Sequence, residues 1–228
     1  MNEPRAVFAT TPERLTVIVR RHDEPGAPPS HGVSVYRGYL TPHPEDLPLP
    51  GRFREDFPSR DEALEQVRRE WRLEAAAFQD VRLGHSVDID FVQALRQGTL
   101  EPLRPGMSAD ALVSALGVPE GITQLIEPGF VCWFYGSVQL HLRAGALQSM
   151  EIDRGMGDFT SLRLKGWFLE CSTTRAQLER ELTSRAVPYA EETVLGAQVL
   201  RLRGAPQQRG FIFDFDADGR IHALYWNV

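Results

Sequence analysis

Residues 138–152 read VQLHLRAGALQSMEI, and apolar and polar side chains alternate on both sides of Arg143-Ala144-Gly145. An alternation with period two is typical of half-buried strands, and a glycine between two such runs favours a tight turn. This stretch therefore predicts a β-hairpin. Residues 211–225, FIFDFDADGRIHALY, have the same pattern around Asp218-Gly219, a pair favoured in hairpins because both residues tolerate positive φ. The sequence thus predicts two hairpins of one design.

The second hairpin also resembles a metal loop, because Asp214, Asp216 and Asp218 have the spacing of the first calcium ligands of an EF-hand. Such a loop needs a bidentate glutamate at its twelfth position, and Tyr225 stands there. The first hairpin makes its turn without any acidic residue. We therefore interpret the aspartates as part of a turn, and we expect neither a metal nor a cofactor.

A helix is predicted before each hairpin. Ser108 is a capping residue and Gly117 a stop for the first helix, and Thr174 with Gln177 forms a capping box for the second. Each helix runs on to a Val-Pro pair and is followed by three strand-like runs. Helix and three strands thus occur twice, which indicates an internal duplication. The runs are FVCWFY, VQLHL and LQSMEI in the first copy, and AQVLRLR, GFIFDF and RIHALYW in the second.

The N-terminal part predicts a β-β-α module. LTVIVRR and VSVYRGYL have the composition of strands, and a proline-rich connector separates them from a helix. Ser59 and Glu62 form a capping box at the start of this helix. Its inner face carries Leu64, Val67 and Trp71, and its outer face carries a Glu65–Arg69 pair.

These patterns predict an α+β protein with three parts. The β-β-α module spans residues 1–78, and the two copies of a helix with a three-stranded antiparallel meander span 79–155 and 156–228. A further helix is expected over residues 86–98, with Ser86 or Asp88 at its start and Gly98 at its end. Its inward positions are Ile89, Val92 and Leu95.

Composition limits the classes of function. The chain has 228 residues, 42% of them hydrophobic and 25% charged, as in ordinary soluble globular proteins. It has neither an apolar run of the ~20 residues that a membrane span needs nor an export signal at its start, so we expect a cytoplasmic protein. A net charge of −6 disfavours nonspecific nucleic-acid binding. Lys165 is the one lysine among 25 basic residues, which indicates a GC-rich bacterial genome.

No motif predicts catalysis. Cys132 and Cys171 lie in apolar runs, where buried inert thiols are expected. His85, Asp88 and Asp90 lie close together, but a helix start explains this spacing. His141 and His222 are expected on the polar sides of strands, and the sequence contains no nucleophile or phosphate-binding motif.

One part of the chain resembles a known family. LRPGMSADALVSALGVPE at 103–120, followed by WFYGSVQL, resembles the helix-plus-three-strand module of small bacterial outer-membrane-assembly lipoproteins. Their motif is a Gly-Met-Ser/Thr helix that ends in Leu-Gly-x-Pro, here Gly106–Ser108 and Leu116–Pro119. The resemblance covers residues 86–153, with a second copy at 159–227. It implies a protein-binding module without catalysis.

The leading hypothesis is a non-enzymatic bacterial protein that binds another protein. The chain resembles single-gene proteins of GC-rich bacteria, among which toxin-neutralising immunity proteins are common, so we expect an immunity protein that blocks a toxin by direct contact. The expected contact residues are Asp214, Asp216, Asp218, Trp133 and Tyr135, since aromatic residues dominate interfaces. The alternatives are a hydrolase-like enzyme, with a site between modules that uses His85, Asp88 or the Asp214–Asp218 cluster, and a scaffold component of a larger assembly.

Overall fold

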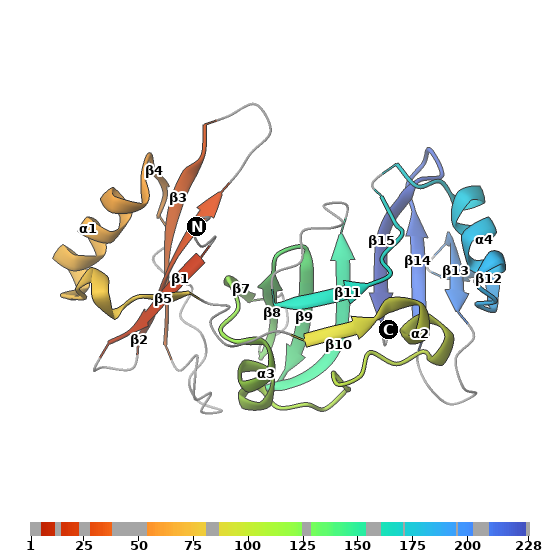
Figure 1. Ribbon diagram of the computed structural model, residues 1–228, viewed down its shortest axis with the longest axis horizontal. Coiled ribbons are helices and arrows are strands. Elements are labelled where there is room, and N and C mark those ends of the chain that lie inside the picture. Colours follow the sequence, from red (N-terminus) through yellow and green to blue (C-terminus); the bar gives the residue numbers. More distant parts are fainter. Residues whose placement is uncertain are drawn as a thin grey trace.

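The fold is taken from a computed structural model of the chain. The residues that it describes are 6–11, 15–22, 28–37, 54–80, 87–124, 129–153, 161–170, 172–194, 196–202 and 210–226. They form a five-stranded sheet, an eight-stranded sheet and a two-stranded ribbon (Figure 1).

The five-stranded sheet is antiparallel and has the order β4-β3-β2-β1-β5. Helix α1 (Arg60–Trp71) covers one of its faces (Figure 1), and a short 3₁₀ turn, η1 (Ala75–Ala77), leads to the last strand. The prediction of two strands and a helix was therefore incomplete. The strands are β1 (Ala6–Thr10), β2 (Leu15–His22), β3 (Ser30–Arg37), β4 (Arg54–Phe57) and β5 (Gln79–Asp80).

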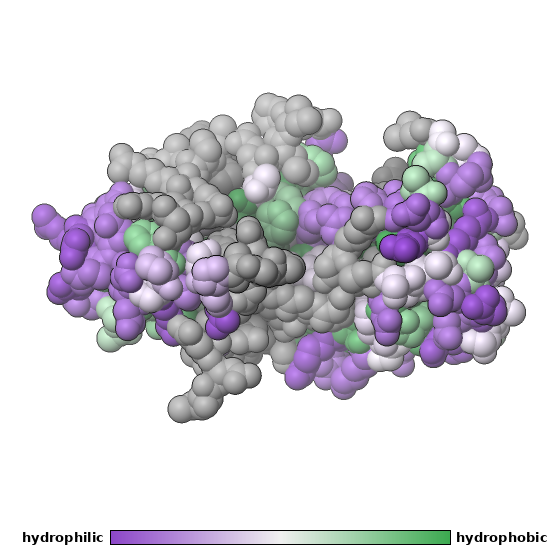
Figure 2. Space-filling view, turned by 90° about the horizontal axis from the view of Figure 1, so that it is seen from above, coloured by the Kyte–Doolittle hydropathy of each residue, from purple (hydrophilic) through white to green (hydrophobic). Residues whose placement is uncertain are grey.

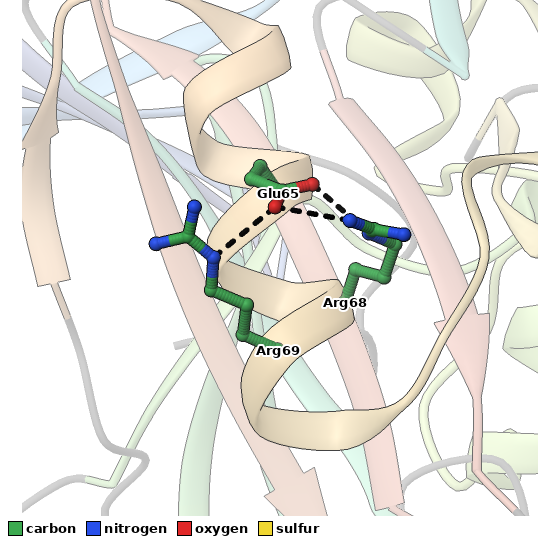
Figure 3. A network of polar contacts seen from close by, with 3 residues as sticks. All are labelled: Glu65, Arg68 and Arg69. Atoms are coloured by element: carbon green, nitrogen blue, oxygen red, sulfur yellow. Dashed lines mark hydrogen bonds and ion pairs between the residues drawn. The ribbon is translucent and has the colours of Figure 1, made fainter.

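Helix α1 has the predicted start and outer face. The Ser59 side chain accepts a hydrogen bond from the backbone N–H of Glu62 at 3.3 Å. On the outer face, the Glu65 carboxylate lies 2.9 Å from Arg68 Nε and 3.1 Å from Arg69 Nε (Figure 3). The predicted Glu65–Arg69 pair is thus confirmed. Since these side chains are exposed, the pairs add little to stability.

The two faces of the five-stranded sheet pack against different partners. Val7 and Val17 lie in a cluster with Val67 of α1, whereas Ile18 belongs to the larger core with the eight-stranded sheet. At this second contact Arg20 Nε lies 3.7 Å from Glu120 Oε2, and the Glu120 side chain is fully buried. Strand alternation therefore places the α1 layer and the eight-stranded sheet on opposite sides of β2.

The eight-stranded sheet consists of two four-stranded meanders joined at their last strands. Its order is β12-β13-β14-β15-β10-β9-β8-β7, and all neighbours are antiparallel. The first meander contains β7 (Gly121–Gln124), β8 (Phe130–Tyr135), β9 (Val138–Arg143) and β10 (Ala146–Asp153). The second contains β12 (Tyr189–Val194), β13 (Ala197–Leu202), β14 (Phe211–Phe215) and β15 (Ile221–Trp226).

Each meander has one strand more than predicted. The additional strands, β7 and β12, are the outer strands of the sheet, and β7 has only four residues. In β12 no residue is fully buried. An outer strand with charged residues shows little of the apolar alternation by which strands are recognised in a sequence.

Each meander is held to a helix by the same pair of backbone hydrogen bonds. Helices α3 (Ala109–Leu116) and α4 (Arg175–Ser184) are capped by Ser108 and Thr174, as predicted. The backbone N–H of the first helical residue donates to the carbonyl of the glycine in the following hairpin turn. The second residue after that glycine donates back to the carbonyl of the residue before the cap. The four bonds are Ala109 N–H to Gly145 O at 2.8 Å, Arg175 N–H to Gly219 O at 2.8 Å, Leu147 N–H to Met107 O at 2.9 Å and Ile221 N–H to Thr173 O at 3.0 Å.

The helix expected over residues 86–98 is shorter than predicted. Residues Val87–Asp90 form strand β6, which pairs in parallel with β11 (Leu162–Lys165), and helix α2 covers Phe91–Gln97. Asp90, rather than Ser86 or Asp88, caps the helix by accepting a hydrogen bond from Gln93 N–H at 2.9 Å. Gly98 ends it in a left-handed conformation, as expected. Ser86 lies outside the described residues.

Helices α2, α3 and α4 and the β6–β11 ribbon lie on one face of the eight-stranded sheet (Figure 1). Leu112 of α3, Leu178 of α4 and Leu164 of β11 share one hydrophobic core with the inward side chains of the strands. The Trp226 indole N–H also donates to Gly98 O at 3.2 Å, which fastens the last strand to the end of α2. Within the part of the chain described, no helix is long and apolar enough to cross a membrane.

The α+β class is therefore confirmed, and so is the pairing of β14 with β15 as a hairpin. The two turns differ in detail. Ala144 and Gly145 both have positive φ in the first turn, whereas Gly219 has φ of 72° in the second and Asp218 keeps an ordinary backbone. Of the Asp218-Gly219 pair, only the glycine thus uses the positive φ that both residues tolerate.

We predict that Gly219→Ala lowers the free energy of unfolding by about 1–2 kcal/mol, because an L-residue is strained at this φ. An added Cβ would meet no atom within 4 Å, so backbone conformation alone sets the cost. Gly219→Asn is the matched control and should cost less, since asparagine tolerates the left-handed region. Urea unfolding of the three proteins checks this, and equal stability of the alanine variant and the wild type would contradict it.

Candidate binding face of the eight-stranded sheet

The face of the eight-stranded sheet opposite the helices is mostly polar. In β9, for example, Leu140 and Leu142 are buried inward while Gln139 and His141 point outward and are half-buried. We call the following side chains from five neighbouring strands the outer face: Cys132, Gln139, His141, Ser149, Glu151, Asp153, Asp214, His222 and Tyr225.

The centre of the outer face lies where the two meanders meet. Glu151 of β10 is paired in register with Gln139 of β9 on one side and with Tyr225 of β15 on the other. The Tyr225 hydroxyl lies close enough to the Glu151 carboxylate to lower the pKa of Glu151. The two halves of the sheet are therefore connected by a polar contact on this face as well as by the backbone.

The imidazole of His141 is held between a hydroxyl and a carboxylate. Its Nδ1 lies 3.3 Å from Ser149 Oγ, and its Nε2 lies 3.6 Å from Glu151 Oε2. A hydroxyl, an imidazole and a carboxylate are also the groups of a catalytic site with a serine nucleophile. Ser149, however, is only 6% exposed. The contact therefore orients the imidazole and does not present a serine nucleophile to solvent.

A second chain of contacts crosses the first meander. The Gln139 side-chain amide donates to Asp153 Oδ2 at 3.2 Å, and the Cys132 thiol donates to Gln139 Oε1 at 3.4 Å. Burial raises the pKa of Cys132 to about 12, and the charge of Glu151 adds to this. Cys132 is thus a protonated thiol at neutral pH, in agreement with the prediction of a buried thiol. Cys171 lies outside the described residues.

A β-bulge shapes the outer face at the same place in each meander. The register shifts between Leu147 and Ser149 in β10, and β15 has an extra residue, His222, opposite Asp214. Two residues of a bulged strand oppose one residue of its partner, so a bulge redirects side chains. In β15 it brings His222 Nδ1 to 3.5 Å from Asp214 Oδ2.

The central groups have shifted pKa values. Burial raises the pKa of Glu151, and the negative charge of Asp153 raises it further, while the Tyr225 hydrogen bond and the charge of His222 oppose this. Burial lowers the pKa of His141. The pKa of Tyr225 is raised by burial and by the charges of Glu151, Asp214 and Asp153. Three carboxylates thus lie close enough to interact electrostatically with one hydroxyl.

The structure places two of the five expected contact residues in the core. Trp133 and Tyr135 point inward from β8 and are 3% and 1% exposed. The Tyr135 hydroxyl donates to Gly117 O at 2.9 Å, inside the core. Neither side chain is available to a partner on the folded protein, because strand alternation directs both toward the helices. The expectation of contact through these two residues is therefore corrected.

The three aspartates are divided between the turn and the outer face. Asp216 Oδ1 accepts from the backbone N–H groups of Asp218 and Arg220, both at 2.9 Å, so this carboxylate stabilises the turn. Asp218 is exposed at the tip. Asp214 lies on the outer face, where its Oδ1 accepts from Phe215 N–H at 2.9 Å. Among the described residues, no group of three or more histidine, cysteine or acidic side chains could hold a metal ion.

The residues expected to form an enzyme site do not lie together in the part of the chain that the structure describes. Asp88 lies on β6, 2.6 Å from Arg163 Nε and 2.8 Å from Lys165 Nζ, on the side of the sheet that the helices cover. These two cations lower the pKa of Asp88. Asp214 lies on the opposite face, and His85 falls outside the described residues.

Sequence reasoning missed Glu151, Asp153 and Gln139 as site residues. A signal for them exists in the alternation of VQLHLR and LQSMEID, where they share the polar positions with His141 and Ser149. The alternation assigns residues to two faces but does not say which strand lies beside which. That β10 and β15 are neighbours is what places Glu151 beside Tyr225.

No protein-family model, curated protein or solved structure matches this chain significantly. The function is therefore inferred from the outer face itself.

We predict opposite shifts of the Glu151 pKa in two variants. Asp153→Asn should lower it, because a like charge is removed, whereas Tyr225→Phe should raise it, because a hydrogen bond to the carboxylate is lost. NMR titration of the side-chain carboxyl of Glu151 measures both shifts. The Glu65 carboxyl, whose pKa the hydrogen bond from Arg68 lowers, is the control and should not respond. A Glu151 pKa that moves in the same direction in both variants would contradict the described contacts.

Proposed function

We propose that the protein binds another protein through the outer face of the eight-stranded sheet, without catalysing a reaction. The observation that carries this proposal is the continuity of the face across the β10–β15 junction. Half-buried polar groups of both meanders, such as Gln139 and Tyr225, lie there on the two sides of Glu151 in one surface. A tyrosine at the centre of such a surface is a common anchor in protein interfaces.

The composition of the surface supports a polar interface. From above, hydrophilic residues cover most of the described surface (Figure 2), and on the outer face itself Gln139, His141, Glu151 and Asp153 are polar. A non-obligate interface is about as polar as the rest of a protein surface, so a large apolar patch is not required. The partner of this face is expected to be a separately folded protein that binds and is released.

Within this class we propose an immunity protein of a bacterium, acting in the cytoplasm against a toxin. The support is the net charge of −6 together with the acidic centre of the outer face. Many toxins act on nucleic acids and therefore carry basic surfaces, which an acidic face would cover and neutralise.

The test is affinity capture from the native host with tagged wild-type protein and two variants. Tyr225→Ala removes the central aromatic side chain and should weaken capture by about 30-fold, as expected for an interface anchor. Arg180→Ala changes an exposed residue of α4 on the other side of the sheet and is the matched control.

Support for the proposal is a stoichiometric partner that the wild type and Arg180→Ala retain and Tyr225→Ala loses. A partner retained equally by all three proteins would place the interface elsewhere. A toxin gene beside this one, whose product the wild type inhibits and Tyr225→Ala does not, would support the immunity role.

A further inference from the structure

We propose that the five-stranded sheet and helix α1 form a movable module, which the buried Arg20–Glu120 pair holds on the eight-stranded sheet and which separates from it without unfolding. We call β1–β5 together with α1 the N-terminal module. It lies at the β7 end of the eight-stranded sheet (Figure 1). The movement would uncover Glu120 and the side of β2 that carries Ile18, and it does not involve the outer face.

The N-terminal module has a hydrophobic core of its own. Val7, Val17 and Val33 of its sheet pack with Val67 of α1, and every described residue of this cluster lies between residues 7 and 78. In the described ranges, no strand of the module is paired with a strand of the eight-stranded sheet. A unit with its own core and its own sheet can keep its fold when it moves relative to its neighbour.

The contact between the module and the eight-stranded sheet is partly polar. Among the described residues of the module, Ala6 and Ile18 are the buried members of the shared core, and Phe8 packs against it half-buried. Thr16 and Ser34 lie on the same side of the sheet as Ile18, and both are buried. Contacts of this mixed composition within a chain resemble transient protein–protein interfaces, for which relative motion is the default expectation.

The Arg20–Glu120 pair connects the two units within this contact. Arg20 belongs to β2, and Glu120 directly precedes β7; the two charged groups lie 3.7 Å apart, and the Glu120 side chain is fully buried. A Cβ added at Gly121 would lie 3.7 Å from Arg20 Nη1, so the guanidinium also reaches the first residue of β7. Burial raises the pKa of Tyr135 well above its usual value, and the charge of Glu120 raises it further. The carboxylate therefore lies between the guanidinium and the core.

This pair acts on the position of the module because its two partners come from different units. A buried carboxylate without its cation is strongly unfavourable, whereas replacement of both partners by apolar side chains is often neutral or stabilising. Glu120 meets water once the module has moved away, so the cost of an unpaired carboxylate falls on the closed arrangement alone. Loss of the Arg20 charge should therefore favour separation of the module.

The test is thiol labelling with iodoacetamide at two adjacent positions, in the full chain carrying either Ile18→Cys or Val17→Cys. Both side chains are fully buried, but Ile18 faces the shared core and Val17 faces the core of the module. A thiol at position 18 becomes accessible when the module separates, whereas a thiol at position 17 becomes accessible only when the module unfolds. Mass spectrometry of the peptide that contains the position measures each rate apart from the native cysteines. Position 18 should react at least about tenfold faster.

The role of the ion pair is tested in the same two proteins. Arg20→Met should speed labelling at position 18 at least about tenfold and leave the rate at position 17 unchanged. Addition of Glu120→Met should return the rate at position 18 to its starting value, since no unpaired carboxylate is then buried. Arg69→Met is the matched control, because it removes one charge of an exposed pair on α1, and it should change neither rate.

Equal labelling rates at positions 17 and 18, or equal acceleration of both by Arg20→Met, would show that the module opens only by unfolding and would overturn the inference. An unchanged rate at position 18 in Arg20→Met, or a rate that Glu120→Met does not restore, would overturn the role of the ion pair. The labelling needs no partner protein. Its failure therefore leaves the proposed binding face standing, and failure of partner capture through Tyr225 leaves the movement standing.

Discussion

The antiparallel pairing of β10 with β15 is the contact on which the larger sheet depends. Without it there would be two four-stranded meanders, each with an unpaired strand and half of a polar face. The pairing runs from Met150–Trp226 to Asp153–Ala223. It buries Ile152 and Leu224 on one side and places Glu151 beside Tyr225 on the other. One backbone contact therefore completes both the hydrophobic core and the candidate binding face.

Local sequence signals predicted the helices and hairpins well, because capping side chains and turn residues act over a few positions. Ser59, Ser108 and Thr174 each cap the helix that they were expected to start. The failures involve structure that depends on distant partners. Val87–Asp90 was expected in a helix, yet it forms a strand because β11, more than 70 residues later, supplies its backbone partner. The outer strands β7 and β12 were missed for a related reason, since each owes its conformation to one neighbouring strand.

The candidate site was only partly predictable for the same reason. Alternation shows that Trp133 and Leu140 share one face of a sheet, but it does not show that helices cover this face, so exposed aromatics could not be told from buried ones. Asp214, Asp216 and Asp218 formed one group in the sequence. The structure divides them, because the backbone of a turn recruits Asp216 while the strand directs Asp214 onto the outer face. Similarity to known proteins does not help here, so the argument depends on these contacts.

The paired bulges have a consequence for how the outer face could diverge between related proteins. In both meanders an extra residue projects outward beside the turn, and the inward side chains keep their places. At corresponding positions the first meander has His141, Gln148 and Ser149, and the second has Asp214, His222 and Ala223. The outward side chains at these positions thus differ in chemistry between the two meanders, although the inward side chains of both meanders are apolar. Selection on partner specificity can therefore act on the outer face while the leucine-rich interior, and with it the ability to fold, stays the same.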